Sequence, residues 1–285
     1  MNIVYNELMK NHTSFKIGGP CDEFAQVTSE EEVAELIEYA KSKGIPYTVM
    51  GNGSNLLVSD KGIRGLVIKL AKGFEKAEVS GNSIICQSGI LLSKLSNFAL
   101  KNSLSGLEFA SGIPGTLGGA IYMNAGAYGG EMKDVVREVT YLENGEIKTS
   151  SQCDFGYRHS IFTDSDAIIL SARLELCKGE YDVIKARMEE LSAKRNEKQP
   201  LSMPSAGSTF KRPEGYFAGK LIEDAGLRGF SIGGAMVSEK HCGFVVNCGN
   251  ATCSDVVELI HHVQKVVYDK FGVKLEPEVK ILGEV

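Results

Sequence analysis

The first part of the chain changes from a helical to a strand-like hydrophobic pattern. Apolar residues recur on one helical face at Val33, Leu36, Ile37 and Ala40. Ser29 and Glu32 have the spacing of a capping box, and Gly44 is suited to the left-handed residue that ends a helix. Short apolar runs follow at 47–50, 56–58 and 66–70. A helix and strands in such close succession predict a small α/β lobe.

From about Ala77 the pattern is typical of antiparallel strands. Residues 78–88 predict a hairpin that turns at Gly81-Asn82, and residues 135–142 and 146–150 predict a second one across Asn144-Gly145. A helical face at residues 91–99 and a strand at 167–176 complete this lobe. Between them, residues 105–130 contain eight glycines. We therefore predict a mostly antiparallel lobe that carries a glycine-rich loop.

The last third begins after an amphipathic helix predicted at residues 181–198. Pro200 and Pro204 mark a boundary there. Helices are expected near 217–225 and 254–271, and strands near 235–237, 244–248 and 279–282. Thr252 with Asp255 opens the long helix, and Gly272 closes it.

Composition narrows the class of protein. The chain has 285 residues, 43% of them apolar and 24% charged, which excludes a disordered chain and fits two or three domains. The net charge of −5 gives no indication of a nucleic-acid partner. No apolar run approaches the roughly 20 residues that span a bilayer, and the first ten residues do not resemble a signal peptide. We expect a cytoplasmic monomer without membrane insertion.

Seven dispersed cysteines favour free thiols in a reducing compartment. The closest three, Cys242, Cys248 and Cys253, lack a C-x-x-C step, so no metal site is predicted.

The glycine loops allow two interpretations. Gly51-Asn-Gly-Ser-Asn55 begins like a dinucleotide fingerprint, but Leu56 replaces the third glycine and a strand follows. No Walker motif is present. Because glycine lets the backbone approach a ligand closely, loops 51–55 and 112–130 are suited to a pyrophosphate. They are equally suited to be tight turns in a β-rich core.

Seven motifs follow one another along the chain: Asn11-His-Thr-Ser-Phe-Lys-Ile-Gly-Gly19, Gly51-Asn-Gly-Ser-Asn-Leu-Leu57, Gly112-Ile-Pro-Gly-Thr-Leu-Gly-Gly-Ala120, Met123-Asn-Ala-Gly-Ala-Tyr128, Tyr157-Arg-His-Ser160, Ala206-Gly-Ser-Thr-Phe-Lys211 and Glu276-Pro-Glu-Val279. Together and in this order, they resemble the motifs of the UDP-N-acetylenolpyruvoylglucosamine reductase family. The resemblance covers nearly the whole chain. It implies reduction of UDP-N-acetylglucosamine enolpyruvate to UDP-N-acetylmuramate, for peptidoglycan, by NADPH through a bound FAD.

The resemblance also implies an α+β fold. After an N-terminal segment (1–15) comes a PCMH-type FAD-binding domain (16–179) with lobes at about 16–70 and 71–179. A connecting helix (180–199) leads to a smaller α/β substrate-binding domain (200–285), whose terminal strand returns toward the first lobe. The chain resembles the short subtype, because it lacks the tyrosine-bearing insertion and has Arg212 where the longer subtype has asparagine.

The family's cofactor and substrate residues map onto numbered positions. The implied FAD-binding residues are Gly51, Asn52, Gly53, Ser54, Asn55, Leu56, Gly112, Pro114, Gly115, Gly118, Gly119, Asn124, Ala125 and Gly126. Those implied for the substrate are Tyr157, Lys211 and Arg212, with the two cations suited to its diphosphate. From residue type alone, Tyr157 also fits a buried core position and the Lys-Arg pair a solvated surface.

Three residues are implied in the chemistry. Ser208 is the proton donor, while Arg158 and Glu278 stabilise the enolic intermediate; an arginine fork matches a carboxylate bidentately. The alternatives are a turn serine after Gly207, an Arg158–Asp154 ion pair, and a site role for Glu276 in place of Glu278. His241 is interpreted as structural.

Two rival functions remain open. One keeps the FAD domain but oxidises an alcohol or hydroxy acid. The other is a non-catalytic flavin- or sugar-nucleotide-binding protein.

Overall fold

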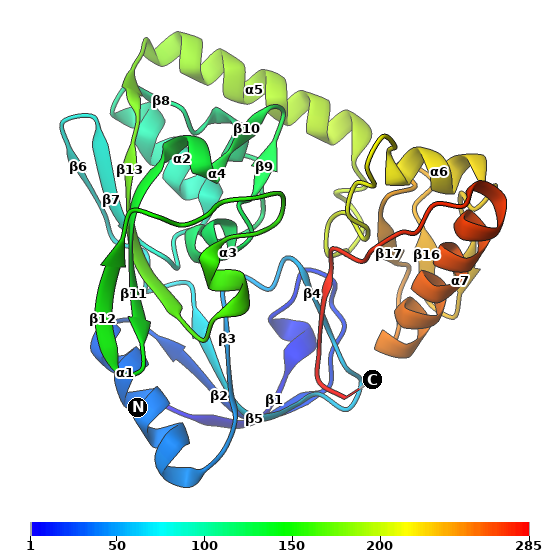
Figure 1. Ribbon diagram of the computed structural model, residues 1–285, viewed down its shortest axis with the longest axis horizontal. Helices are drawn as coiled ribbons and strands as arrows, with labels where there is room; N and C mark the ends of the chain where they lie inside the picture. The colour runs from blue at the N-terminus through cyan, green and yellow to red at the C-terminus, as the bar shows by residue number, and fades with distance from the viewer. Residues whose placement is uncertain (1, 285) are drawn as a thin grey trace. The chain divides into compact units, whose positions relative to one another are not determined.

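The computed structural model describes residues 2–284, which form two compact units (Figure 1). The first unit consists chiefly of residues 25–52 and 67–195. The second contains residues 4–24, 53–66 and the chain from Asn196 onward. Both units are therefore built from segments that are distant in the sequence.

The first unit is centred on a five-stranded antiparallel sheet. Its strand order is β12 (Glu146–Ser150), β11 (Val136–Glu143), β13 (Ile168–Glu175), β7 (Ser83–Gln87) and β6 (Ala77–Ser80). Asn144 and Gly145 both have positive φ, as a type I′ hairpin turn requires. Both predicted hairpins and the predominantly antiparallel lobe are confirmed.

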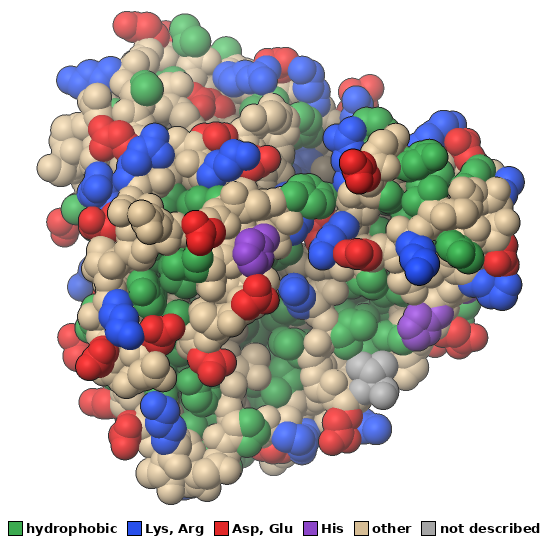
Figure 2. All heavy atoms as spheres, in the orientation of Figure 1, with side chains coloured by type: hydrophobic (Ala, Val, Ile, Leu, Met, Phe, Trp, Pro, Cys, Tyr) green, Lys and Arg blue, Asp and Glu red, His purple; other side chains and the backbone are tan. Residues whose placement is uncertain are grey.

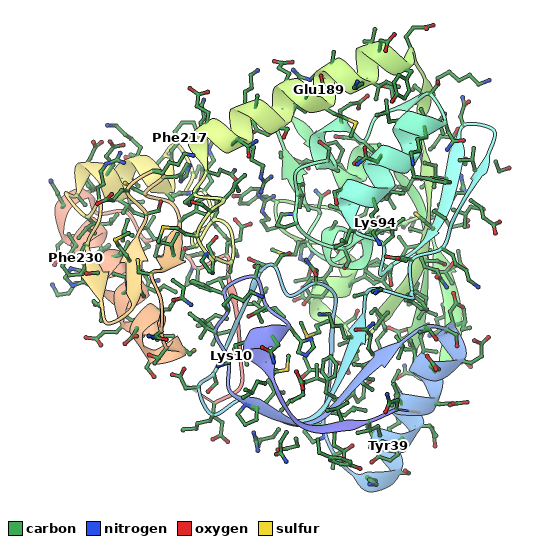
Figure 3. The ribbon with its side chains drawn as sticks, turned by 180° about the vertical axis from the view of Figure 1, so that it is seen from behind. Lys10, Tyr39, Lys94, Glu189, Phe217 and Phe230 are labelled. Atoms are coloured by element: carbon green, nitrogen blue, oxygen red, sulfur yellow. The ribbon has the colours of Figure 1, made fainter. Side chains whose placement is uncertain are left out.

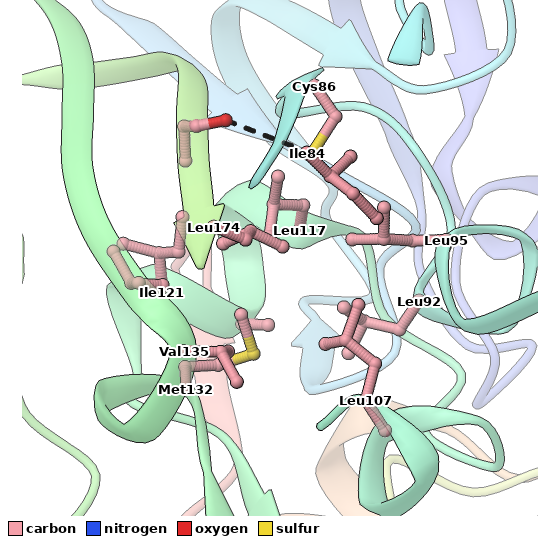
Figure 4. Packing of buried hydrophobic residues seen from close by; sticks show 14 of the residues in the cluster. Ile84, Cys86, Leu92, Leu95, Leu107, Leu117, Ile121, Met132, Val135 and Leu174 are labelled. Carbon is pink, nitrogen blue, oxygen red and sulfur yellow. Dashed lines mark hydrogen bonds between the residues drawn. The ribbon is translucent and has the colours of Figure 1, made fainter. Parts of the chain in front are cut away.

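Buried side chains from α2 (Leu92–Lys101), α3 (Leu117–Tyr122) and α4 (Met132–Val135) pack with those of this sheet. Figure 4 shows the packing around Leu95, Leu117 and Leu174, with the Cys86 thiol donating to the Ala172 carbonyl oxygen at 3.9 Å. The helix α5 (Tyr181–Lys198) buries Ile184, Met188 and Leu191, while Glu189 points away from the protein (Figure 3). This spacing gives α5 one apolar face.

The α/β part of the first unit contains α1 (Glu30–Lys43), β3 (Tyr47–Met50) and the ends of β2 (Pro20–Val27) and β5 (Ile63–Leu70). The Ser29 hydroxyl accepts the Glu32 N–H at 3.3 Å, and Gly44 ends α1 with φ of +65°. The Glu32 carboxylate accepts the N–H of Thr28 at 2.6 Å, one residue before the donor that a capping box predicts, and backbone hydrogen bonds from Thr28 and, more weakly, from Ser29 lower the pKa of Glu32.

The second unit surrounds α7 (Cys253–Phe271) with α6 (Ala218–Asp224) and a three-stranded sheet. That sheet has the order β15 (Ser231–Ile232), β16 (Ala235–Val237) and β17 (Val245–Asn247). The predicted Thr252–Asp255 capping box is present, and Gly272 closes α7 with φ of +69°. The Asp60 carboxylate accepts two more N–H groups at this helix start, from Cys253 at 2.7 Å and Ser254 at 3.0 Å.

Early segments of the chain complete the core of the second unit. Phe15, Ile17 and Leu57 are buried in one cluster with Val256 and Leu259. The strand β18 (Lys280–Leu282) pairs in parallel with β4 (Leu56–Val58). β1 (Val4–Leu8) pairs antiparallel with β2.

The sequence analysis did not predict several elements, most of them short. They are β1, β2, β8 (Leu104–Ser105), β9 (Gly126–Ala127), β10 (Gly130–Glu131), β14 (Cys177–Lys178), β15, α3, α4 and the 3-10 turns η1 (Met9–Asn11), η2 (Glu108–Ala110) and η3 (Ile161–Asp164). On the surface, acidic and basic side chains are interspersed over the face seen in Figure 2. Among the described residues, no helix combines the length and hydrophobicity needed to cross a bilayer.

Candidate flavin and substrate sites

In the first unit, two of the glycine loops meet. The Asn52 side-chain amide donates to the Pro114 carbonyl oxygen at 2.7 Å. Next to it, a Cβ on Gly51 would overlap the Thr116 hydroxyl, well inside van der Waals contact. Thr116 is buried, so the contact has little freedom to widen. Glycine at position 51 is therefore required for the close approach of segments 51–52 and 114–116.

Two further glycines of the second loop are packed closely. A Cβ on Gly118 would lie 2.9 Å from the Cβ of Ser88, and one on Gly112 would lie 2.9 Å from the Cδ of Arg195. The hydroxyl of Ser88 and the Nε of Arg195 are buried, and neither has a hydrogen-bond partner among the described residues. Burial of its guanidinium lowers the pKa of Arg195. The side chains of Ser88 and Arg195 therefore pack closely against this loop, and each brings a buried polar group to it.

Asn124 connects this loop to the turn that carries Arg158. The residue is buried, with φ of +43°. Its amide nitrogen donates to the Glu131 carboxylate and to the Gly156 carbonyl oxygen, each at 2.9 Å, and its oxygen accepts the Lys133 N–H at 3.0 Å. Hydrogen bonds from Lys133 and then from Asn124 lower the pKa of Glu131. The Asn124 side chain therefore fixes the surrounding backbone.

Tyr157 and Arg158 lie at the tip of a tight turn. Gly156 and His159 bond through their backbones at 3.0 and 3.4 Å. Arg158 has φ of +55°, a left-handed conformation that is unfavourable for a residue with a Cβ. Its guanidinium carbon lies 5.0 Å from the centre of the Tyr157 ring, and that ring is 52% exposed, so the core position considered for Tyr157 is wrong. Such outliers cluster at functional sites, which supports a role for Arg158.

In the second unit, Ser208 and Glu278 lie on two segments held together by Thr209. The Glu278 N–H donates to the Thr209 carbonyl oxygen at 2.8 Å, and the Thr209 N–H donates to the Gly243 carbonyl oxygen at 2.8 Å. The buried Thr209 hydroxyl accepts the Val245 N–H at 2.9 Å. Ser208 precedes Thr209 and follows Gly207, which has φ of +78°. The backbone thus brings Ser208 close to Glu278 across 70 residues of sequence.

The loop 53–56 joins the same group. The Asn55 side-chain amide donates to the Glu278 carbonyl oxygen at 3.0 Å, and the Asn55 carbonyl oxygen accepts the Lys280 N–H at 2.9 Å. Leu56 is paired with Lys280 in β4 and β18. Asn55 therefore connects the motif at 51–57 with the motif at 276–279.

The two candidate cations after Ser208 differ in their surroundings. Lys211 forms an ion pair with Glu276 at 3.3 Å, and the Glu276 side chain is 73% exposed. The guanidinium carbon of Arg212 lies 4.0 Å from the centre of the Phe217 ring, which is labelled at the start of α6 in Figure 3. The Nε of Arg212 donates to the Tyr216 carbonyl oxygen at 3.3 Å.

The sequence analysis did not single out Ser88, Thr116, Glu131 or Thr209, which hold these loops. Thr116 and Thr209 lie inside quoted motifs, so their positions were visible but their contacts were not. The fit to a flavin dinucleotide rests on the first unit. There, Gly51 packs against the Thr116 side chain and Gly118 against Ser88 so closely that neither position has room for a Cβ, and the buried Ser88 hydroxyl has no hydrogen-bond partner among the described residues.

Comparison with known proteins agrees with this division. Residues 21–151 match the family model described as FAD binding domain. Residues 199–282 match the model for the C-terminal domain of UDP-N-acetylenolpyruvoylglucosamine reductase. The fold and its glycine-lined loops thus define an FAD-binding oxidoreductase of two domains.

Relatives identify the family. The UDP-N-acetylenolpyruvoylglucosamine reductase of Caldanaerobacter subterraneus is 57% identical over 98% of this chain and 93% of its own length. That of Clostridioides difficile is 54% identical over 99% and 94%. The crystal structure of the Thermus caldophilus reductase superposes with a TM-score of 0.85 at 37% identity, covering 99% of this chain and 98% of its own. The chain belongs to the UDP-N-acetylenolpyruvoylglucosamine reductase family, which acts in peptidoglycan precursor synthesis.

Proposed function

We propose that this chain reduces UDP-N-acetylglucosamine enolpyruvate to UDP-N-acetylmuramate with NADPH as the hydride source. When bound, FAD supplies the hydride chemistry that couples NADPH oxidation to reduction of the carbon–carbon double bond. The observation that carries the proposal is the Thr209–Glu278 backbone bond, because it places the two residues expected to complete the reaction on adjacent, fixed segments.

Ser208 is proposed to donate the proton to the carbon beside the carboxylate. A hydroxyl is a weak acid, so this role needs a strongly basic acceptor and a fixed geometry. Ser208 is half-buried, and both of its neighbours are constrained, Gly207 by its left-handed backbone and Thr209 by its hydrogen bonds. These features support a hydroxyl held in one place.

Arg158 and Glu278 are proposed to stabilise the enolic intermediate. The guanidinium of Arg158 would bind the enolpyruvyl carboxylate bidentately and offset the negative charge that builds up on it. Glu278 would act as a neutral acid that donates a hydrogen bond to that charge. The left-handed backbone of Arg158 supports the first role, and the two backbone bonds of Glu278 support a fixed position for the second.

The remaining candidate residues are proposed to bind FAD or the substrate. Backbone at 51–56 and 112–119, with the turn at 124–126, would hold FAD, and the close packing of Gly51 against Thr116 and of Gly118 against Ser88 would keep these loops in place. Tyr157, Lys211 and Arg212 would contact the substrate. We further propose that the chain is of the short subtype, acts as a monomer and works in the cytoplasm.

Anaerobic half-reactions test the function. The purified protein is examined for FAD by absorbance, reduced with NADPH, and then mixed with UDP-N-acetylglucosamine enolpyruvate. Rapid reoxidation with formation of UDP-N-acetylmuramate is the expected result. A protein that NADPH reduces but this substrate cannot reoxidise would favour an alcohol or hydroxy-acid oxidoreductase. A protein that takes up no FAD would favour the non-catalytic alternative.

The Ser208→Ala variant tests the proton donor. Reduction by NADPH should persist, while reoxidation by the enolpyruvate should slow by about 10²- to 10⁴-fold, the usual contribution of a general acid. The exposed Ser202 of the same segment, changed to alanine, is the matched control. Equal losses in both half-reactions would make Ser208 a structural residue.

A further inference from the structure

His241 lies two residues before Gly243, whose carbonyl oxygen accepts the Thr209 N–H. The half-buried imidazole accepts the Gly243 N–H at its Nδ1, at 3.1 Å. A backbone N–H can only donate, so Nδ1 must carry a lone pair and the ring proton of the neutral imidazole lies on Nε2. The contact therefore exists only while Nδ1 is unprotonated.

The imidazole is held firmly by its surroundings. Its ring meets the Phe244 ring edge-on, with centres 5.0 Å apart. A Cβ on Gly243 would lie 2.9 Å from the Cε1 of His241, and a Cβ on Gly219 would lie 3.3 Å from the same atom. The His241 N–H donates to the Ser238 hydroxyl at 3.3 Å. Two glycines thus leave room for a ring fixed against the backbone.

A chain of hydrogen bonds leads from this ring to the proposed catalytic residues. His241 holds the N–H of Gly243, and the carbonyl oxygen of Gly243 accepts the Thr209 N–H at 2.8 Å. The carbonyl oxygen of Thr209 then accepts the Glu278 N–H at 2.8 Å. The N–H and the carbonyl oxygen of Gly243, like those of Thr209, belong to adjacent peptide groups that are joined through the Cα, and the Thr209 N–H belongs to the peptide group that joins Ser208 to Thr209.

We propose that His241 is a positioning residue for Ser208 and Glu278, acting through the Gly243 and Thr209 peptide groups. The proposal rests on the proposed function of those two residues. Because the imidazole is linked to both residues through the backbone, its removal should disturb proton donation and enolate stabilisation while leaving flavin reduction by NADPH unchanged.

Protonation of the His241 imidazole should slow reoxidation by the enolpyruvate, as removal of the imidazole does. Burial lowers the pKa of His241 and the positive charge of Arg228 lowers it as well, and together they outweigh a backbone hydrogen bond that raises it. Arg228 is itself bonded to the Glu223 carboxylate at 2.6 Å and to the Glu239 carbonyl oxygen, and Cys242 also acts on it, while the ammonium of Lys240, next to His241 in the chain, donates to the Asn196 carbonyl oxygen at 2.5 Å. The neutral acceptor is therefore the form present at neutral pH, and acid should convert it to a donor.

The experiment compares His241→Ala with His241→Asn. An asparagine oxygen can accept the N–H two residues ahead, as in an Asx turn, so Asn keeps the bond to Gly243 and loses the titration. In anaerobic stopped flow, His241→Ala should be reduced by NADPH at the normal rate. Reoxidation by UDP-N-acetylglucosamine enolpyruvate should be about tenfold to a hundredfold slower, as expected when catalytic groups are misplaced. His241→Asn should recover most of that rate.

The exposed His261 of α7, changed to alanine, is the matched control. If His241→Ala does not fold, the pH dependence of reoxidation decides. The natural protein should lose the rate in acid with an apparent pKa below the ordinary histidine value of about 6.5, and His241→Asn should lack that loss. Reoxidation at the normal rate in His241→Ala, or parallel losses in both half-reactions, would overturn the proposal. A natural protein that the enolpyruvate cannot reoxidise would instead refute the proposed function.

Discussion

Replacing Gly51 by alanine should show how strongly the two glycine loops depend on each other. The added Cβ would overlap the Thr116 hydroxyl. Thr116 is 2% exposed and cannot turn its side chain into solvent. The loops must therefore move apart, which would also weaken the Asn52–Pro114 hydrogen bond at 2.7 Å.

The magnitude follows from overpacking. An extra methyl group in a closely packed interior costs about 1–3 kcal/mol, so Gly51→Ala should lower the free energy of unfolding by that amount. Thr116→Ala in the same chain removes the clashing atoms and leaves the Thr116 Cβ at 3.3 Å from the new methyl. The two changes should thus be coupled, with the double variant roughly 0.5–3 kcal/mol more stable than additivity predicts.

The assay is urea unfolding followed by circular dichroism at several FAD concentrations. The dependence on FAD concentration separates intrinsic stability from ligand affinity. Gly119→Ala is the matched control, because its Cβ would meet the Thr116 hydroxyl oxygen at an ordinary 3.7 Å within α3. That substitution should be neutral or stabilising, since alanine favours a helix. Equal stability of Gly51→Ala and Gly119→Ala, together with an additive double variant, would refute the reasoning.

Three further predictions concern single residues. Thr209→Val should cost about 1–3 kcal/mol in urea unfolding because it leaves the buried Val245 N–H without its acceptor, whereas Thr209→Ser should keep most of the stability. Hydrogen bonds from the Thr252 and Gly234 N–H groups lower the pKa of Asp255, so its carboxylate stabilises the fold above its unfolded pKa and loses that effect as pH falls through the lower native one. Asp255→Asn should therefore be less stable at pH 7 by about 0.5–1 kcal/mol, with the difference shrinking only as the pH falls below about 4 toward the lowered native pKa. The free energy of unfolding of Arg158→Asn should lie within about 1 kcal/mol of that of the natural protein, because asparagine tolerates the left-handed backbone. The reduced flavin of this variant should nevertheless no longer be reoxidised by the enolpyruvate.

The long periodic elements were predictable from the sequence. The helix α7 combines an apolar face with a capping box and a closing glycine, and the β11–β12 hairpin carries Asn144-Gly145. In both, local chemistry and tertiary packing favour the same structure. The strand β1 was missed because four of its five residues are exposed, so no alternation marks a buried face. The short elements between 104 and 135 depend on close contacts, such as that of Gly130 with Phe109, which a local pattern does not reveal.

In the candidate site, too, some features could be predicted from the sequence and others could not. Motif order alone indicated Ser208 and Glu278, and the structure adds why they belong together, namely the peptide group of Thr209. Spacing in the sequence left Glu276 and Glu278 equivalent. The fold gives them different partners: the Glu276 side chain is exposed and paired with Lys211, whose N–H also donates to the Glu276 carbonyl oxygen, while the backbone of Glu278 is bonded to Thr209 and to the Asn55 side chain.

The hydrophobic core of the second unit combines residues from both ends of the chain, which has a consequence for folding during synthesis. Phe15, Ile17 and Leu57 are buried beside Val256 and Leu259, which leave the ribosome about 200 residues after Leu57. At a synthesis rate of roughly 5–20 residues per second, the side chains that these early residues pack against are made about 10–40 s later. During that interval they are exposed apolar surface that chaperones and proteases can bind. A chain released early, for example before α7 is synthesised, should therefore retain an unfolded N-terminal segment and be degraded quickly.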